Sequence, residues 1–424
     1  MKIINNPDRA QWPQLCQRPQ LELEFLESAV KNVLVRVRKS GDAALKEFTL
    51  QFDKVSLDNI AVTETEIDAA VNSLSSSLKA AILSAAKNIE TFHAAQKRPI
   101  SFIETMPGVT CWRKETAVQK VGIYIPGGSA PLFSTVLMLG VPARLAGCNE
   151  VVLCTPPDKE GKINPAILFA AHHTGIKKIF KVGGAQAIAA MAYGTETIPS
   201  VSKIFGPGNQ YVTKAKQLVS QEGIAIDMPA GPSEVFVIAD SVADPSYLAA
   251  DLLSQAEHGA DSQVILATTN SELVPLVLKE IENQISRLPR KEIAREALAN
   301  SLALIFESKK DLMDFTNEFA PEHLIINTAD CDQLVEMVFN AGSIFLGPYT
   351  PEAAGDYASG TNHTLPTNGF AKAFGGVSLE SFMKCITIQK ITKQGLELLG
   401  PIVEIMAEAE QLKGHAEAVR VRRK

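Results

Sequence analysis

The sequence predicts an α/β protein with two α/β units and a helical tail. Two separate series of apolar strands alternate with helical segments, a pattern typical of parallel sheets covered by helices. The first series comprises VGIYI, EVVLC, KIFKV and SKIFG, and the second comprises EVFVIAD, QVILATT, LALIFES, HLIIN and SIFLG. A chain of 424 residues also exceeds what one hydrophobic core usually serves, so we expect two or more domains.

The segments that flank these series have different patterns. Apolar residues recur at three-to-four spacing through LEFLESAVKNVLVRVRK and LKAAILSAAKNIETFHAAQ, which predicts a helical opening. GVTCWRKETAV then alternates like an edge hairpin. Beyond Pro351, glycine and proline interrupt the chain to about Ser378, and we expect a helical tail from there to the terminal RVRRK.

Composition and charge exclude several classes of function. The net charge is −6, whereas a surface for nucleic acid or anionic membrane needs a basic excess. The opening MKIINNPDRAQWPQLCQ has no apolar signal region, and no apolar run approaches the roughly 20 residues of a membrane span. The 6 cysteines are dispersed without a CxxC pair, which fits buried thiols in a reducing cytosol. We therefore expect a soluble, cytoplasmic protein that acts on a small molecule.

Glycines gather where strands of the first series would meet helices. Each cluster has a polar neighbour: Tyr124 near Gly127-Gly128, Gln186 near Gly183-Gly184, and Asn209 after Gly206-Pro207-Gly208. Because parallel strands end at one edge of a sheet, these clusters favour a crevice where backbone can approach a ligand. This unit resembles a dinucleotide-binding fold but has YIPGGSAP in place of GxGxxG, so a nucleotide would bind in a nonstandard mode. Ordinary turns remain the alternative for any one cluster.

A predicted helix in ADPSYLAADLLSQAEHG carries two possible metal ligands. Asp244 can cap this helix, Pro245 suits its first turn and Gly259 suits its end. Gln255 and His258 are three residues apart, which places both side chains on one helical face. A carboxamide oxygen and an imidazole nitrogen could there share one cation. A solvated helix end is the alternative.

Further ligands would have to come from elsewhere, because zinc normally takes four donors. Asp356 lies in a loop rich in small residues, where a carboxylate can bend toward a site, and His415 follows Gly414 near the chain end. Taken alone, Asp356 is a turn former and His415 is a solvated residue of the tail.

The APEHL segment offers an acid and an imidazole side by side. Pro321 ends a predicted helix, HLIIN begins a strand, and Glu322 and His323 occupy the junction. Histidine titrates near neutrality and can accept the proton of an alcohol, while a partly buried glutamate can activate water. Successive residues of an extended strand point to opposite sides, so both reach one pocket only if the junction is irregular. Otherwise they are solvated groups at a strand edge.

Eight short motifs follow one another along the chain: YIPGG, GGAQAI, GPGNQYV, AGPSEV, LLSQAEHG, APEHL, GDYASGTNHTLPT and LKGHA. Together they resemble the histidinol dehydrogenase family, from about Leu21 to the last helix. The resemblance implies two incomplete Rossmann-like units of the aldehyde-dehydrogenase kind. It also implies a zinc enzyme that oxidises L-histidinol through the bound aldehyde to L-histidine, reducing NAD twice in the last steps of L-histidine biosynthesis. LPTNG at 365–369 departs from the family's usual Thr-Gly-Gly, and the opening segment is short.

The resemblance further implies a set of site residues. One zinc ion per subunit would be held by Gln255, His258, Asp356 and His415. The acid/base residues would be Glu322 and His323. Nucleotide contacts would fall on Tyr124, Gln186 and Asn209. Substrate contacts would fall on Ser233, Glu410, His323 and the four zinc ligands.

Domain organisation and partner are expected on the same basis. Residues 1–20 form an N-terminal segment, residues 21–120 and 234–370 a first α/β domain with the zinc and the base, and residues 121–233 a second, NAD-binding domain. Residues 371–424 form a helical tail exchanged in a homodimer with shared active sites, so Glu410 and His415 would act in the partner's site. The tail is amphipathic and needs something to pack on.

Two other functions stay open. One is a zinc and NAD dehydrogenase of the same superfamily that acts on another small alcohol, against which Ser233 and Glu410 favour histidinol. The other is a catalytically idle protein that binds metal or nucleotide, against which the intact pair of Glu322 and His323 argues.

Overall fold

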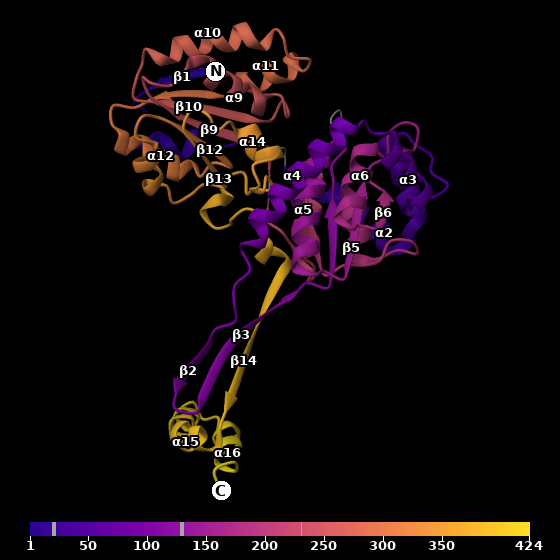
Figure 1. Cartoon of the computed structure of the whole chain (residues 1–424), viewed down its shortest axis with the longest axis vertical. Coiled ribbons are helices and arrows are strands. Elements are labelled where there is room, and N and C mark those ends of the chain that lie inside the picture. Colours follow the sequence, from indigo (N-terminus) through magenta and orange to yellow (C-terminus); the bar gives the residue numbers. More distant parts are fainter. Residues whose placement is uncertain (19–22, 128–130, 230) are drawn as a thin grey trace.

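The chain folds into two α/β domains and a slender arm that extends away from them (Figure 1). The structure, a computed structural model, describes residues 1–18, 23–127, 131–229 and 231–424. This part contains two parallel sheets and one antiparallel sheet, which confirms the predicted α/β class. No helix among the described residues is both long enough and apolar enough to cross a membrane.

The five-stranded domain is built on a fully parallel sheet. Its strands, in spatial order, are β6 (Lys178–Lys181), β5 (Glu150–Thr155), β4 (Lys120–Tyr124), β7 (Lys203–Phe205) and β8 (Ala225–Ile226). One face is covered by α3 (Glu64–Ser73), α4 (Ser76–Ala94), α5 (Phe133–Ala146) and α6 (Pro165–Thr174). The other face is covered by α2 (Leu23–Phe48), α7 (Gly184–Tyr193) and α8 (Gln210–Gln221).

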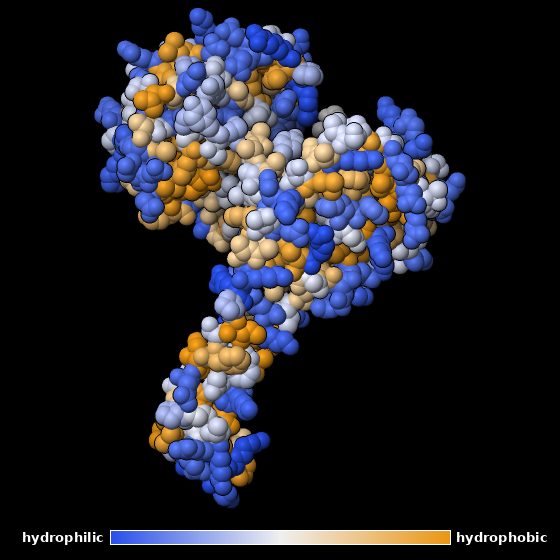
Figure 2. Space-filling view, viewed as in Figure 1, coloured by the Kyte–Doolittle hydropathy of each residue, from blue (hydrophilic) through white to orange (hydrophobic). Residues whose placement is uncertain are grey.

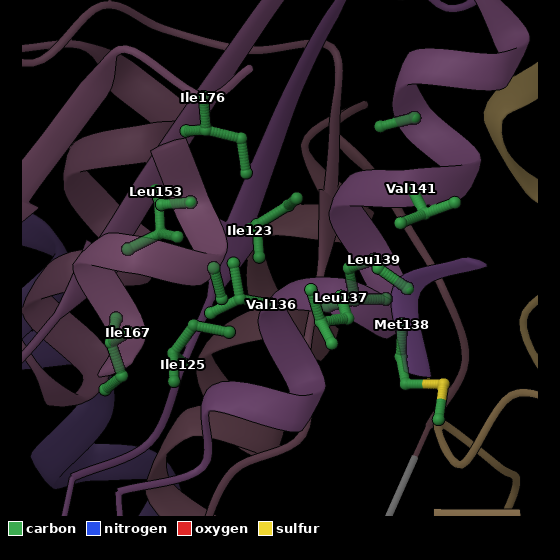
Figure 3. Packing of buried hydrophobic residues seen from close by; sticks show 14 of the residues in the cluster. Ile123, Ile125, Val136, Leu137, Met138, Leu139, Val141, Leu153, Ile167 and Ile176 are labelled. Atoms are coloured by element: carbon green, nitrogen blue, oxygen red, sulfur yellow. The ribbon is translucent and has the colours of Figure 1, made fainter. Parts of the chain in front are cut away.

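Helix α5 explains why this core is so apolar. It lies between the sheet and α4, and every residue from Ser134 to Ala143 is buried, so it is buried on all sides, and it is mostly apolar rather than apolar on one stripe. Side chains of β4, β5 and α5 meet in this core (Figure 3).

The placement of α2, α3 and α4 differs from the expected domain organisation. That organisation groups residues 21–120 with residues 234–370, but these helices pack on the five-stranded sheet; residues 21 and 22 lie outside the described part. An amphipathic pattern indicates that one face of a helix is buried, but it does not say against which sheet.

The six-stranded domain is also fully parallel. In spatial order its strands are β1 (Lys2–Asn5), β11 (Leu302–Ile305), β10 (Gln263–Thr268), β9 (Glu234–Ala239), β12 (His323–Asn327) and β13 (Ser343–Leu346). Helices α9 (Pro245–Ala256), α10 (Leu273–Ile285) and α11 (Lys291–Ala299) cover one face. Helices α1 (Trp12–Leu15), α12 (Lys309–Phe319) and α13 (Cys331–Leu334) lie at the other. Strand β1 is an addition to the five strands expected in this domain.

The arm is an antiparallel sheet that carries two helices at its end (Figure 1). Its strands, in spatial order, are β14 (Met383–Ile391), β3 (Val109–Ala117) and β2 (Phe102–Met106). Helices α15 (Lys393–Ala409) and α16 (Lys413–Arg420) follow β14. The expected hairpin is present, but its strand β3 lies in the middle of the sheet rather than at an edge. The expectation of a purely helical tail is wrong, since β14 pairs with β3 along nine residues.

Shorter turns complete the chain. A π-helical turn, Thr49–Asp53, follows α2, and α14 (Glu352–Tyr357) precedes the long loop to the arm. Short 3-10 turns lie at Arg9–Gln11, Val335–Met337, Phe370–Lys372 and Leu379–Phe382.

We predict that Phe382 fixes the base of the arm. Its buried ring stacks on Phe205 with 4.0 Å between the ring centroids, so Phe382→Ala should lower the free energy of unfolding by about 3–5 kcal/mol through the cavity it leaves. Denaturant unfolding measures this. Phe339, which is 80% exposed, is the matched control, and Phe339→Ala should change stability by less than about 0.5 kcal/mol. Equal effects of the two substitutions would contradict the assignment.

Candidate active site

A cavity of about 360 Å³ lies where the two α/β domains meet. From the five-stranded domain it is lined by residues at the carboxyl ends of β4 and β7, among them Tyr124 and Asn209. From the six-stranded domain it is lined by residues at the amino ends of β9 and β12, among them Ser233, Glu322 and His323. Sites in open α/β sheets usually lie at carboxyl ends, so only one wall of this cavity follows the rule.

Glu322 and His323 both reach this cavity because the junction before β12 is irregular. Helix α12 ends at Phe319, and Ala320 adopts a left-handed backbone with φ 54°. Both side chains are buried, and Oε2 of Glu322 lies 3.5 Å from Nδ1 of His323. The junction is therefore irregular, as it must be for Glu322 and His323 to reach one pocket.

The backbone of Glu234 at the start of β9 holds both side chains. Its N–H donates to Oε2 of Glu322 at 2.9 Å, and its carbonyl oxygen lies 3.1 Å from Nδ1 of His323. A carbonyl can only accept, so Nδ1 carries the hydrogen in this contact. The other ring nitrogen, Nε2, is then the one free to accept a proton when the imidazole is neutral.

Two further carboxylates surround Nε2 of His323. Oδ1 of Asp356 lies 3.4 Å away and Oε1 of Glu352 lies 3.9 Å away, both on α14. Burial acts to lower the pKa of His323, but the charges of Glu322 and Glu352 and a hydrogen bond to Asp356 together raise it well above 6.5. Burial raises the pKa of Glu322, and it raises the pKa of Glu352 to about 8. The site therefore holds several acids close together, and the protonation of each depends on that of its neighbours.

Glu352 is a member of the site that the sequence motifs did not single out. It precedes Asp356 by four residues in PEAAGD, one helical turn, and this spacing could have revealed it. Its Oε2 accepts a hydrogen bond from the hydroxyl of Ser254 on α9 at 3.0 Å. Among the described residues, His323, Glu352 and Asp356 form a group whose ligand atoms lie within 4.8 Å of one another, a donor set that could hold a cation.

Gln255 has an unusual environment at the end of α9. Its side chain is fully buried, and neither Oε1 nor Nε2 has a hydrogen-bond partner within the described protein. Buried amides are nearly always paired, so this one fits a site that a further group completes. His258 lines the cavity together with Asp356. It lies beyond the last residue of α9, which is Ala256.

The expected geometry of this helical pair is therefore wrong in one respect. Asp244 does cap α9 and Pro245 does open it, but Glu257 rather than Gly259 forms the C-cap. His258 therefore lies in the turn after the helix rather than on a face of the helix. Spacing alone could not show this, because the last turn of a helix often unwinds before its sequence pattern ends.

Glu410 and His415 lie far from the cavity within one chain. Glu410 caps the end of α15 and His415 lies in α16, at the tip of the arm (Figure 1). Both are exposed. One chain therefore brings together Ser233, His258, Glu322, His323 and Asp356, but not these two residues of the tail.

A second cavity, of about 1050 Å³, adjoins the first along Tyr124, Gly127 and Asn209. Gln186 lines it at the start of α7. The hydroxyl of Tyr124 accepts from the N–H of Gly184 at 3.0 Å. The crevice predicted from the glycine clusters is present at this sheet edge; Gly128 lies outside the described residues.

Gly206 shows why glycine is needed at this edge. Its φ is 124°, and a Cβ there would lie 2.1 Å from the carbonyl oxygen of Tyr124. Any other residue would force β4 and β7 apart. Asn209 follows Gly206 by three residues. Its side-chain oxygen, Oδ1, accepts a hydrogen bond from the N–H of Val212 at 3.1 Å and so caps α8.

Comparison with known proteins identifies the family. The family model for histidinol dehydrogenase matches residues 16–423. The histidinol dehydrogenase of Bacteroides fragilis strain YCH46 is 58% identical over 422 residues, which is 100% of this chain and 99% of the relative. The chain belongs to the histidinol dehydrogenase family.

Other members of the family agree over the same length. The histidinol dehydrogenase of Pectobacterium atrosepticum is 52% identical over 412 residues, covering 96% of this chain and 92% of that protein. The crystal structure of histidinol dehydrogenase from Elizabethkingia anophelis has a TM-score of 0.97 and 55% identity, covering 100% of this chain and 98% of that one. This chain is therefore an oxidoreductase by family, and the resemblance drawn from its eight motifs is confirmed.

Proposed function

We propose that this member of the histidinol dehydrogenase family oxidises L-histidinol through L-histidinaldehyde to L-histidine, with NAD as the acceptor. The observation that supports this best is the buried pair of Glu322 and His323 at a cavity that adjoins a second, larger one. An acid/base pair next to room for a dinucleotide is what an alcohol dehydrogenase needs. The cytoplasmic location expected from the sequence stays a prediction.

The two residues have separable tasks in this proposal. Nε2 of His323 takes the proton of the substrate hydroxyl while a hydride leaves the carbinol carbon. Glu322 then removes a proton from the water that attacks the aldehyde carbonyl, while the protonated Nε2 of His323 returns its proton to the carbonyl oxygen. The neutral Nε2 of His323 then takes a hydroxyl proton of the resulting hydrate as a second hydride leaves. The raised pKa of Glu322 suits a carboxylate that accepts a proton. When bound, NAD supplies the acceptor for each hydride.

The nucleotide would occupy the larger cavity. Tyr124, Gln186 and Asn209 line it, and α7 and α8 begin there, so their backbone N–H groups can receive a diphosphate. Tyr124 and Asn209 line both cavities, so the reactive end of a dinucleotide bound in this way would lie next to the acid/base pair. No GxGxxG turn is needed for this arrangement.

Zinc would be held by Gln255, His258 and Asp356 of one chain. The unpaired amide of Gln255 supports this, because a metal ion would satisfy its oxygen. When bound, zinc supplies a positive centre that holds the amine and imidazole of the substrate in place. The cluster of His323, Glu352 and Asp356 is the competing donor set. We favour the set with Gln255 because it leaves His323 free for proton transfer. Ser233, a proposed substrate contact, lines the same cavity.

The fourth zinc ligand would be His415 of a second copy of the chain. His415 and the substrate contact Glu410 lie at the tip of the arm, where they are exposed and cannot reach the cavity of their own chain. Large apolar side chains are exposed along the arm, including Phe102, Ile103, Leu398, Ile402 and Ile405, and orange patches mark the arm in Figure 2. A homodimer that exchanges arms would bury these side chains and complete both sites.

The reaction itself is tested by counting electrons. Oxidation of an alcohol to a carboxylate transfers two hydrides, so we expect about two NADH per L-histidinol consumed, and loss of this activity after chelation of zinc. Absorbance of NADH and chromatography of the product measure both quantities. A ratio near one would favour simple oxidation of an alcohol, and no NADH from a folded, zinc-loaded protein would favour the idle binding protein.

We predict that Gln255→Leu separates metal binding from folding. Leucine removes an unpaired buried amide, so the metal-free protein should be at least as stable as the wild type. The stabilisation that saturating zinc adds, about 4 kcal/mol at a thousandfold excess over Kd, should be lost. Thermal unfolding with chelator and with zinc measures both effects. Gln263, a buried glutamine of β10 that donates to the carbonyl of Asn300, is the matched control, and Gln263→Leu should keep the zinc shift. A zinc shift retained by Gln255→Leu would exclude this ligand.

Arm exchange predicts complementation between inactive chains. His415→Ala and His258→Ala each damage a different wall of the shared site, so a mixed dimer should contain one intact site and random mixing should restore about a quarter of the activity. Mixing His258→Ala with Asp356→Ala is the control, since both residues come from one chain and every site stays damaged. Equal recovery in the two mixtures, or none in verified mixed dimers, would rule out arm exchange.

A further inference from the structure

The guanidinium of Arg18 is buried between the start of β9 and the end of α12, the two elements next to the acid/base pair. Its Nε donates to Oε2 of Glu234 at 2.8 Å, and Nη2 donates to Oε1 at 3.3 Å. Nη2 also donates to the carbonyl of Phe319 at 2.7 Å, and Nη1 donates to the carbonyl of Cys16 at 2.8 Å. The side chains of Arg18 and Glu234 are only 7% and 1% exposed. Four hydrogen bonds from one planar group in a dry pocket fix its partners tightly.

Two of the three partners of Arg18, Glu234 and Phe319, lead directly to the acid/base pair. Glu234 is the residue whose backbone N–H and carbonyl hold Glu322 and His323. Phe319 is the last residue of α12, three residues before Glu322, and the guanidinium of Arg18 stacks over its ring at 3.6 Å. One arginine therefore joins the strand that positions the pair to the helix end from which the pair emerges.

We propose that Arg18 and Glu234 are positioning residues for the acid/base pair, an inference that rests on the oxidation proposed above. Neither side chain lines the cavity, so both act through the backbone at the start of β9. The N–H of Asn368 donates to Oε1 of Glu234 at 2.8 Å and completes the anchorage. The pair also neutralises a fourth carboxylate next to His323, where Glu322, Glu352 and Asp356 already lie.

The chemistry of the pair explains why arginine is required. A lysine at position 18 could meet one oxygen of Glu234, but it could not also reach the carbonyls of Phe319 and Cys16 with a planar fork. Loss of Arg18 would leave the carboxylate of Glu234 buried without its cation, and such a group moves or takes up a proton. Either response displaces the backbone atoms that hold Glu322 and His323, and a misplacement near 1 Å can cost about a hundredfold in rate.

The test is a double-mutant cycle between Arg18 and the base it positions. Arg18→Ala should lower kcat for L-histidinol by about a hundredfold with KM changed by less than about threefold. His323→Asn should lower kcat by several orders of magnitude. In the His323→Asn background, Arg18→Ala should lower the residual rate by less than about threefold, because the side chain that it positions is absent. Rates are taken per folded, zinc-loaded site.

Two controls separate positioning from stability. Arg9 lies in the same N-terminal segment and pairs with Asp311 and Asp314 at the surface, so Arg9→Ala should leave kcat unchanged. A general disturbance of the site that does not act through His323 would lower the rate by the same factor in both backgrounds, and that additive result would overturn the proposal. So would a kcat for Arg18→Ala within about threefold of the wild type.

A spectroscopic readout keeps this inference apart from the proposed reaction. In protein labelled with ¹⁵N-histidine and measured at a pH where the imidazole of His323 is neutral, the wild-type resonance of His323, assigned by its absence in His323→Asn, should show a protonated Nδ1, since that nitrogen faces a carbonyl. Arg18→Ala should mix the two tautomers, and an unchanged resonance would count against positioning. If the wild type fails to oxidise L-histidinol while this difference persists, the proposed function fails and the structural role of Arg18 stands.

Discussion

The burial of several acids around one imidazole is the constraint on which the site depends. Glu234, Glu322, Glu352 and His323 are buried and Asp356 is largely so, and isolated charges are very costly away from water. Each acid therefore has a specific partner: a guanidinium for Glu234, a backbone N–H for Glu322, a hydroxyl for Glu352 and the imidazole of His323 for Asp356. Much of the structure around the cavity consists of groups that stabilise these buried acids.

The same constraint shows which parts of the fold the sequence could reveal. Apolar strands and helices alternate because each must bury a face, and that need is written locally in VGIYI or HLIIN. The choice of sheet for α2, α3 and α4 is not local, since any apolar surface of the right shape would serve. Strand β14 escapes prediction for a related reason: most of its residues are exposed, so burial leaves little trace in its sequence.

The candidate site divides in the same way. Glu322 and His323 could be found because two reactive groups adjoin at a helix-to-strand junction, and Gln255 because it is near His258 in sequence. Glu352 escapes prediction because the small residues around its acidic neighbour, Asp356, are typical of a loop, although both acids lie on α14. The roles of Arg18 and Glu234 depend on contacts between residues 216 positions apart, and no local pattern encodes such a distance.

The opposed orientation of the two sheets gives the shared cavity an electrical polarity. Helix α8 begins on the wall formed by the five-stranded domain, and α7 begins at the adjoining larger cavity, so their positive ends face these two cavities. Helices α9 and α12 end near the opposite wall, so their negative ends face inward. The helix dipoles alone therefore favour anionic groups on the side of the five-stranded domain and cations on the side of the six-stranded domain. In the proposed reaction, this polarity would separate the place of a diphosphate from the place of a metal ion and an amine, with the substrate carbon in the field between them.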